Sequence, residues 1–169
     1  MRADDEAEFR DYVTGHFVAL RRTAFFICGD WHHAEDIVQV ALTKLHRSWR
    51  RVRERGALDA YARQIVIRIC LDDRRRAWHR EDPSSAQPDS IAPRAESETR
   101  LLLLHALTEV PPRQRAALVL RYWEDLSVTE TANMLGCSEG TVKSSTARGL
   151  TSLRGVLARH GLADTTKEI

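Results

Sequence analysis

The chain has 169 residues, of which 43% are hydrophobic and 30% are charged, so it can bury the core of one ordinary domain or of two small ones. Its longest apolar runs, at 24–28 and 116–120, are far shorter than the roughly 20 residues of a membrane-spanning helix. No basic segment followed by an apolar run opens the chain, so we expect neither secretion nor membrane insertion. The three cysteines form no CxxC pair, which argues against a disulfide framework or a zinc module and favours a reducing cytoplasm.

The net charge of +2 is the balance of alternating acidic and basic blocks. Residues 1–43 carry four basic and eight acidic residues, whereas residues 44–80 carry twelve basic and four acidic ones. Residues 81–99 are again acidic, with one arginine and five acids, and residues 100–169 carry nine basic and seven acidic residues. The strongly basic block predicts a surface that binds a polyanion, although a solvated helix face has the same composition.

Helical periodicity predicts three helices in the first half of the chain. The first helix starts near residue 5 and stops at Gly29, and Asp30 can cap the second. The expected apolar positions of the second helix are Ile37, Val40, Ala41, Leu45 and Trp49. A short basic loop at 51–56 then leads to a third helix that opens at Asp59. The expected apolar face of this third helix holds Tyr61, Ala62, Ile65 and Ile69. Its expected polar face holds Gln64, Arg68, Asp72 and Arg75.

A segment rich in proline, serine and acidic residues follows at 81–97, and it holds three of the five prolines. It has little apolar content and no periodicity, so we predict an extended acidic linker between helical domains at 1–80 and 98–169. The expected helices of the second domain are 98–110, 113–124 with Pro112 in its first turn, 128–135 and 138–159. The predicted fold is therefore all-α, with two small helical domains.

The most specific pattern lies in the last two predicted helices. A capping box at 127–130 opens the first of them, and Ala132, Gly136 and Val142 follow at offsets of zero, four and ten. A helix-turn-helix needs a small residue where its helices cross, a glycine in the turn and a branched apolar residue in the second helix. The residues that its second helix would present to DNA are Thr141, Lys143, Ser144, Ser145 and Arg148. A purely structural helical hairpin is the alternative.

These motifs resemble those of a known family. The segments at 111–115, 120–126 and 138–144 resemble region four of the bacterial extracytoplasmic-function sigma factors, and the segment at 34–39 resembles their core-binding motif in region two. The resemblance spans almost the whole chain in the expected order and is greatest for the SigE-like actinobacterial subgroup. It implies an all-helical sigma factor that directs core RNA polymerase to specific promoters and assists promoter melting.

The resemblance implies a role for each surface. Residues that match the surface for the polymerase largest subunit are Ala34, Glu35, Asp36, Gln39 and Thr43. Residues that match the contacts to the minus-ten element are Arg53, Arg55, Gly56, Gln64, Arg68 and Arg75. The helix-turn-helix residues match the contacts to the minus-thirty-five element, although the family often has arginine where Ser145 stands and a bulkier residue at Ala147. The implied partners are core RNA polymerase, through its largest and second-largest subunits, and promoter DNA, with an anti-sigma factor as a further candidate.

The residues themselves indicate no catalytic centre, because no nucleophile motif, phosphate-binding loop or full set of metal ligands appears. Cys28 and His32 stand four residues apart, but two ligands do not make a site. Asp72 and Asp73 are adjacent and therefore diverge by about 100° on a helix. We therefore expect no enzyme, metal or cofactor. The alternative function is a stand-alone helix-turn-helix regulator whose first half is a dimerisation or sensor domain.

Overall fold

The computed structural model describes residues 3–53, 56–79 and 98–161, and every regular element in these ranges is a helix. The chain divides into two compact units, Met1–Asp89 and Ser90–Ile169. The expected all-α class is thus confirmed, while the predicted linker at 81–97 lies outside the described residues. Within the part of the chain that is described, no helix combines the length and the apolar character that crossing a membrane requires.

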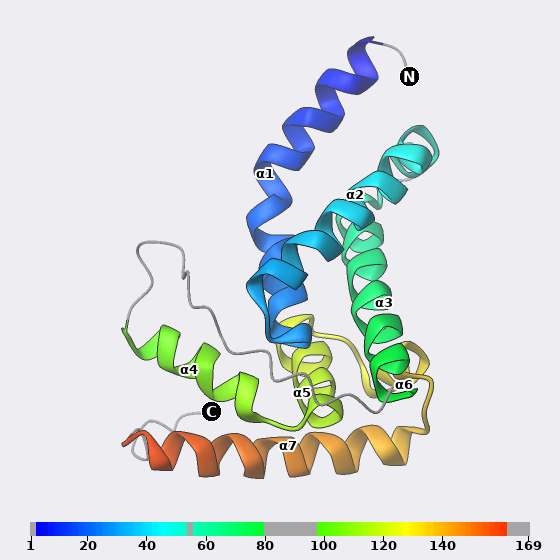
Figure 1. Cartoon of the computed structure of the whole chain (residues 1–169). Helices are drawn as coiled ribbons and strands as arrows, with labels where there is room; N and C mark the ends of the chain where they lie inside the picture. Colours follow the sequence, from blue (N-terminus) through cyan, green and yellow to red (C-terminus); the bar gives the residue numbers. More distant parts are fainter. Residues whose placement is uncertain (1–2, 54–55, 80–97, 162–169) are drawn as a thin grey trace. The chain divides into compact units, whose positions relative to one another are not determined.

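The first unit consists of α1 (Ala3–Cys28), α2 (Trp31–Arg53) and α3 (Leu58–His79), and each helix packs against the other two (Figure 1). Three mutually packed helices enclose one apolar interior, to which all of them contribute. The large side chains that are completely buried in it are Ile27, Ile37, Val38, Leu45, Val66 and Cys70. This interior sets the relative positions of the surface residues on α2 and α3.

The corner between α1 and α2 is built from local hydrogen bonds and one aromatic contact. Gly29 adopts a positive φ of 81°, and its N–H donates to the Phe25 carbonyl at 2.7 Å. The Asp30 carboxylate accepts a hydrogen bond from the His33 N–H at 2.6 Å, which confirms the expected N-cap. The rings of Phe25 and Trp31 stack across the corner with centroids 3.9 Å apart. The turn therefore has a defined direction, and α2 starts from a fixed point.

Two expectations for α2 were wrong. The helix continues through Arg53, so residues 51–53 are helical rather than part of a loop, and the basic last turn suits the negative end of the helix dipole. Val40 was expected in the core but is 48% exposed, whereas its neighbour Val38 is fully buried. In the stretch 37–41 the apolar residues occur at four of five positions, so the helical pattern alone does not select the buried ones.

The buried face of α3 also differs from the expected one. Of the four expected residues only Ala62 is buried, while Tyr61, Ile65 and Ile69 are half-buried. The buried side chains are Ala62, Val66, Ile67, Cys70 and Leu71. Because six of the seven residues at 65–71 are apolar, several faces of this helix fit the pattern equally well. Packing against both α1 and α2 decides between them.

The second unit contains α4 (Glu98–Glu109), α5 (Pro112–Leu118), the π-helical turn η1 (Val119–Trp123), α6 (Val128–Leu135) and α7 (Glu139–Arg159). Pro112 occupies the first turn of α5, as expected. The long α7 packs against α4, α5 and α6, which follow one another along it (Figure 1). The largest fully buried side chains of this unit are Leu120, Val110 and Val142.

The helix expected at 113–124 is interrupted by the π turn. The Glu124 N–H donates to the Val119 carbonyl at 3.0 Å, five residues back, and Asp125 then adopts a positive φ of 52°. Arg121 closes the turn by donating to the Leu126 carbonyl. The widened turn leaves Tyr122 and Trp123 exposed at 61% and 47%. A change from four-residue to five-residue hydrogen bonding has no signature in the apolar pattern, so the sequence did not predict it.

The contact between α5 and α7 requires a glycine. A Cβ atom at Gly149 would lie 2.9 Å from Leu118 Cγ and 3.2 Å from the Gln114 carbonyl oxygen. Gln114 also accepts a hydrogen bond from the Ser152 hydroxyl at 2.8 Å, one turn further along α7. The two helices therefore approach more closely at this point than any residue with a side chain would allow.

We expect Gly149→Ala to lower the free energy of unfolding of the second unit by about 1–2 kcal/mol, because overpacking outweighs the better helix propensity of alanine. Gly155 lies on the same helix, and a Cβ there meets nothing within 4 Å. Gly155→Ala is therefore the matched control and should stabilise the unit by about 0.5–1 kcal/mol. Denaturant unfolding followed by circular dichroism measures both, and equal shifts in the two variants would contradict the close-approach argument.

Candidate nucleic-acid interface

The turn between α6 and α7 has the geometry that the sequence predicted. The Ser127 hydroxyl accepts a hydrogen bond from the Glu130 N–H at 3.1 Å, and the Glu130 carboxylate accepts one from the Ser127 N–H at 2.7 Å. This capping box starts α6, and Gly136 ends it in the left-handed conformation with φ 64°. Ala132 and Val142 are 6% and 0% exposed. The predicted helix-turn-helix is therefore present.

The capping box also makes the start of α6 sensitive to acid. The hydrogen bonds from the Ser127 backbone and side chain hold the pKa of Glu130 below its usual value. A carboxyl whose pKa is lower in the folded state stabilises the fold above its unfolded-state pKa. That contribution is lost as the pH falls through the folded-state pKa, so the cap is intact at neutral pH.

The start of α7 is held by two further hydrogen bonds. The Ser138 hydroxyl accepts from the Thr141 N–H at 3.1 Å, which confirms it as the N-cap. The Thr129 hydroxyl donates to the Glu139 carboxylate at 2.7 Å and so joins α6 to α7. These contacts orient the first turn of α7, which is the part of a recognition helix that meets base edges.

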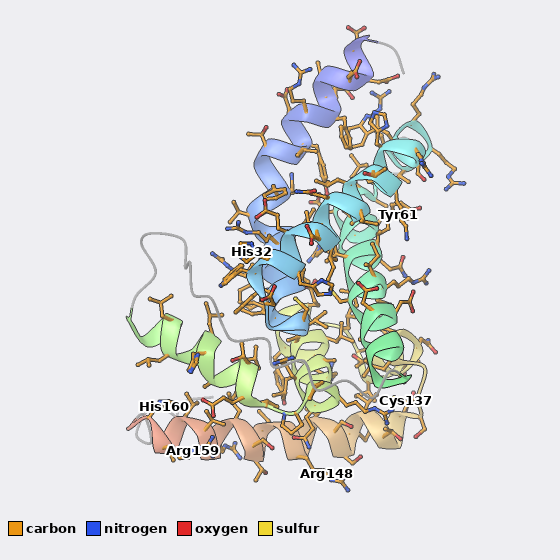
Figure 2. The ribbon with its side chains drawn as sticks, in the orientation of Figure 1. His32, Tyr61, Cys137, Arg148, Arg159 and His160 are labelled. Carbon is orange, nitrogen blue, oxygen red and sulfur yellow. The ribbon has the colours of Figure 1, made fainter. Side chains whose placement is uncertain are left out.

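The outer surface of α7 presents most of the predicted DNA-contacting residues. Thr141, Lys143, Ser144 and Arg148 are exposed, and Ser145 is half-buried. Arg148 projects outward from the helix (Figure 2). Arg154 was missed in the sequence, yet it is exposed and lies eleven residues beyond Lys143, which returns it to nearly the same side of the helix. The positive charge on this side thus extends over three turns.

A second exposed surface lies on the first half of α2. Asp36, Gln39 and Thr43 are exposed, and their spacings of three and four residues place them on one side of the helix. The Thr43 hydroxyl donates to the Gln39 carbonyl at 2.9 Å. Glu35 is half-buried, and its Oε2 lies 3.4 Å from Arg21 Nη1 of α1. This side of α2 offers one free carboxylate, one amide and one hydroxyl that is already bonded.

One residue of that predicted surface was misplaced. Ala34 is buried with 0% exposure, so it packs beneath the surface and forms no part of it. Val40, by contrast, is exposed and stands four residues after Asp36, which adds an apolar side chain to the same side of α2. The motif at 34–39 therefore combines three core positions, Ala34, Ile37 and Val38, with exposed polar residues at Asp36 and Gln39.

The predicted minus-ten residues differ in where the structure places them. Gln64 and Arg68 are exposed one turn apart on α3, and Gly56 has a positive φ of 62° after the end of α2. Arg55 and the side chain of Arg75 lie outside the described residues. The structure thus brings Gln64 and Arg68 together on one face.

Arg53 has structural partners of its own in the first unit. Its guanidinium lies 3.1 Å from the Asp5 carboxylate and also donates to Glu8, both of which are on α1. Arg50 lies 3.6 Å from the same Asp5, which is only 5% exposed. The end of α2 is therefore fastened to the start of α1 by ion pairs that the sequence analysis did not predict.

Comparison with known proteins agrees with this geometry. Residues 13–80 match the family described as Sigma-70 region 2, and residues 100–153 match Sigma-70, region 4. Over 157 residues the chain is 36% identical to the RNA polymerase sigma-E factor of Streptomyces coelicolor. This alignment covers 92% of this chain and 89% of the relative. The chain belongs to the extracytoplasmic-function sigma factors. It is also 34% identical, over 92% of this chain and 80% of the relative, to the ECF RNA polymerase sigma factor SigM of Mycobacterium tuberculosis.

A solved structure shows the same fold in another sigma factor. The sigma factor RpoE of Bartonella quintana, in complex with the anti-sigma factor NepR, matches with a TM-score of 0.65 and 24% identity, over 89% of this chain and 97% of that chain. The two matched sigma regions leave residues 81–99 between them, where the sequence predicts the linker. The resemblance is thus confirmed, and the stand-alone regulator is not favoured.

The ion pairs of Arg53 predict a structural effect of its substitution in this sigma factor. Arg53→Ala removes a partner from the buried Asp5, and we expect the free energy of unfolding of the first unit to fall by about 1–2 kcal/mol. Glu8 is 54% exposed, so Glu8→Gln should cost less than about 0.5 kcal/mol. Chemical denaturation compares the two. A loss in Glu8→Gln as large as that in Arg53→Ala would show that the surface pair carries the stability.

Proposed function

We propose that this sigma factor directs core RNA polymerase to a subset of promoters and assists their melting, while the polymerase supplies all nucleotide chemistry. The observation that carries the proposal is the presence, in one chain, of matched sigma regions two and four with an exposed polar side on α2 and a capped helix-turn-helix. The chain would act in the cytoplasm, where it meets polymerase and DNA. It would need no cofactor and perform no catalytic step of its own.

The proposal assigns the polymerase contact to α2. Asp36 is exposed and can pair with a basic partner, Gln39 and Thr43 can exchange hydrogen bonds, and Val40 adds apolar area beside them. A desolvated carboxylate opposite a basic partner contributes strongly to affinity, because removing either member leaves the other unpaired. An anti-sigma factor that covered this side of α2 would compete with the polymerase.

Asp36→Arg should weaken binding to core polymerase by about 2–5 kcal/mol, while the helical content stays unchanged because the side chain is exposed. Asp11→Arg reverses the charge of an exposed acid on α1 and serves as the matched control. Fluorescence anisotropy with labelled sigma factor measures both affinities. The assignment would be refuted if Asp36→Arg bound core polymerase as tightly as the wild type, or if both variants lost the same affinity for it.

The proposal assigns the separated minus-ten strand to the basic block of the first unit. Gln64 and Arg68 offer an amide and a guanidinium on one exposed face of α3, and the positive φ of Gly56 supports a sharp turn at the end of α2. Capture of a single strand needs cations along its backbone and room for a splayed base. Arg53, Arg55 and Arg75 are assigned to the same strand by their match to the family motif. For Arg53 this role would be in addition to its ion pairs.

The proposal assigns the minus-thirty-five element to α7. Lys143 lies in the second turn after the Ser138 cap, where a recognition helix meets base edges, and Arg148 lies further along. Thr141, before Lys143, and Ser144 and Ser145, after it, add hydroxyl groups to this surface. Arg154 extends the positive charge beyond this set and suits a phosphate contact.

Lys143→Ala should relax sequence preference at one or two positions, by about 1–3 kcal/mol of discrimination, because a base contact is lost. Arg148→Ala should weaken all sequences alike and reduce the slope of log affinity against log salt by about one. Promoter binding by the holoenzyme at several salt concentrations measures both. If Arg148→Ala changed the sequence preference and Lys143→Ala weakened all sequences alike, the two roles would be exchanged. If neither substitution changed promoter binding, α7 would not be part of the interface.

The deciding experiment for the function is run-off transcription with core polymerase on a genomic promoter library. We expect a discrete set of transcripts that depends on the added protein, and weak DNA binding by the protein alone, since one small helix-turn-helix buries little surface. Tight binding of a palindromic site by a dimer of the isolated protein, without transcription, would overturn the proposal in favour of a stand-alone regulator.

A further inference from the structure

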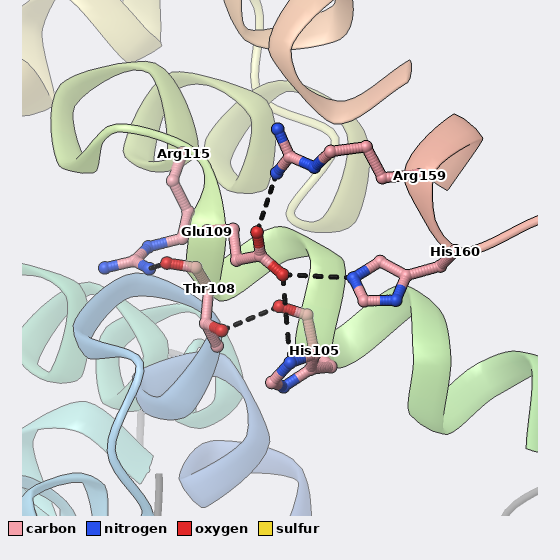
Figure 3. A network of polar contacts seen from close by, with 6 residues as sticks. All are labelled: His105, Thr108, Glu109, Arg115, Arg159 and His160. Carbon is pink, nitrogen blue, oxygen red and sulfur yellow. Dashed lines mark hydrogen bonds and ion pairs between the residues drawn. The ribbon is translucent and has the colours of Figure 1, made fainter. Parts of the chain in front are cut away.

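Three metal-ligating side chains meet where the end of α4 lies beside the end of α7 (Figure 3). His105 and Glu109 stand one turn apart on α4, and His160 is the C-cap residue of α7. Glu109 Oε1 lies 3.1 Å from His160 Nε2 and 3.8 Å from His105 Nε2. One donor atom from each of the three residues can be chosen so that all lie within 4.8 Å of one another.

The two oxygens of Glu109 have different partners. Oε2 lies 2.8 Å from Arg159 Nη2, whereas Oε1 faces both imidazoles. The contact with Arg159 holds one side of the carboxylate and orients it so that Oε1 points between the two rings (Figure 3). A hydrogen bond to a ligating group commonly orients metal ligands in this way.

The backbone beneath the cluster is fixed by buried contacts. The Arg115 side chain is 4% exposed and donates to the Thr108 carbonyl at 2.7 Å, which holds the last turn of α4 (Figure 3). Val110, directly after α4, is 1% exposed, and Val156, in the last turn of α7, is 4% exposed. The three polar side chains thus project from packed helix ends, and their own exposure leaves them open to solvent ions.

We propose that His105, Glu109 and His160 form a three-ligand binding site for a divalent cation of the zinc class. With metal–ligand bonds of about 2.0–2.2 Å, the ligand atoms of a tetrahedral zinc ion lie about 3.3 Å apart. Two of the three observed separations, 3.1 and 3.8 Å, bracket that value, and the third lies within 4.8 Å. Rotation of the exposed side chains would bring the three ligand atoms to the required spacing. Two imidazoles and one carboxylate favour zinc over magnesium or calcium, which prefer oxygen ligands. Water would complete the coordination.

This site differs from the metal candidate considered in the sequence and is independent of the proposed function. One ligand is far from the other two along the chain, since His160 follows Glu109 by 51 residues, so no local motif marks the whole site. A bound ion would bridge α4 and α7, and it would therefore stabilise the second unit wherever free zinc exceeds the dissociation constant.

The test uses the full chain without a polyhistidine tag, after treatment with a chelator. Titration with zinc chloride in a calorimeter should show one site per chain, and a hundredfold excess of zinc over the dissociation constant should raise the Tm of the second unit by about 10 °C. Magnesium chloride should produce neither effect. His105→Ala and His160→Ala should each weaken zinc binding at least tenfold.

The controls separate this site from other zinc ligands of the chain. His32→Ala removes an exposed histidine of the first unit, and Cys137→Ser removes a thiol of the second unit. Both should keep wild-type zinc affinity. Absence of one-to-one binding in the wild type would overturn the proposal. So would unchanged binding in His105→Ala and His160→Ala, or equal losses in the two controls.

Discussion

The close approach of α7 to α5 at Gly149 is the contact on which the second unit depends. With no Cβ at this position, the Leu118 side chain and the Gln114 carbonyl lie against the backbone of α7. This contact, together with the buried Val142 and Val156, decides which side of α7 faces the interior. The opposite side is thereby left to Lys143, Arg148 and the other residues assigned to DNA. A small change in this packing would rotate or displace the whole recognition surface.

Helix ends provide the second constraint. Asp30, Ser127 and Ser138 each satisfy a backbone N–H that would otherwise lack a partner inside its helix. Gly29 and Gly136 adopt positive φ values at the corners that precede α2 and α7, respectively. These caps are local, so they give α2, α6 and α7 a definite first residue. They therefore also fix the positions, along α2 and α7, of the residues that we propose to bind polymerase and DNA.

Charged residues serve the structure as well as the interface. We propose a DNA contact for Arg53 from its match to the family motif, yet its guanidinium also forms ion pairs with the α1 acids Asp5 and Glu8. The Glu109 carboxylate similarly contacts one arginine and two histidines where α4 meets α7. Substitutions at such residues change stability and binding together. The effect on unfolding must therefore be measured before a loss of activity is assigned to a lost contact.

The local signals in the sequence determined most of the fold and of the helix-turn-helix. Capping residues, glycines and prolines act through their nearest neighbours, and for that reason the starts of α2, α5, α6 and α7 were predicted correctly. The exposure of Thr141, Lys143, Ser144 and Arg148 also follows from local periodicity once Val142 is placed inside.

Tertiary structure decided what depends on contacts between distant residues. Apolar stretches such as 65–71 fit more than one buried face, and only packing against α1 and α2 selects Val66 and Cys70. The burial of Ala34 and the exposure of Val40 have the same origin. The π turn at Val119–Trp123 is held by hydrogen bonds between near neighbours, but the pattern of apolar residues does not reveal it. The ion pairs of Arg53 and the cluster around Glu109 join residues some 45 to 51 positions apart. No pattern of neighbouring residues encodes such distances, because they exist only once the helices have packed.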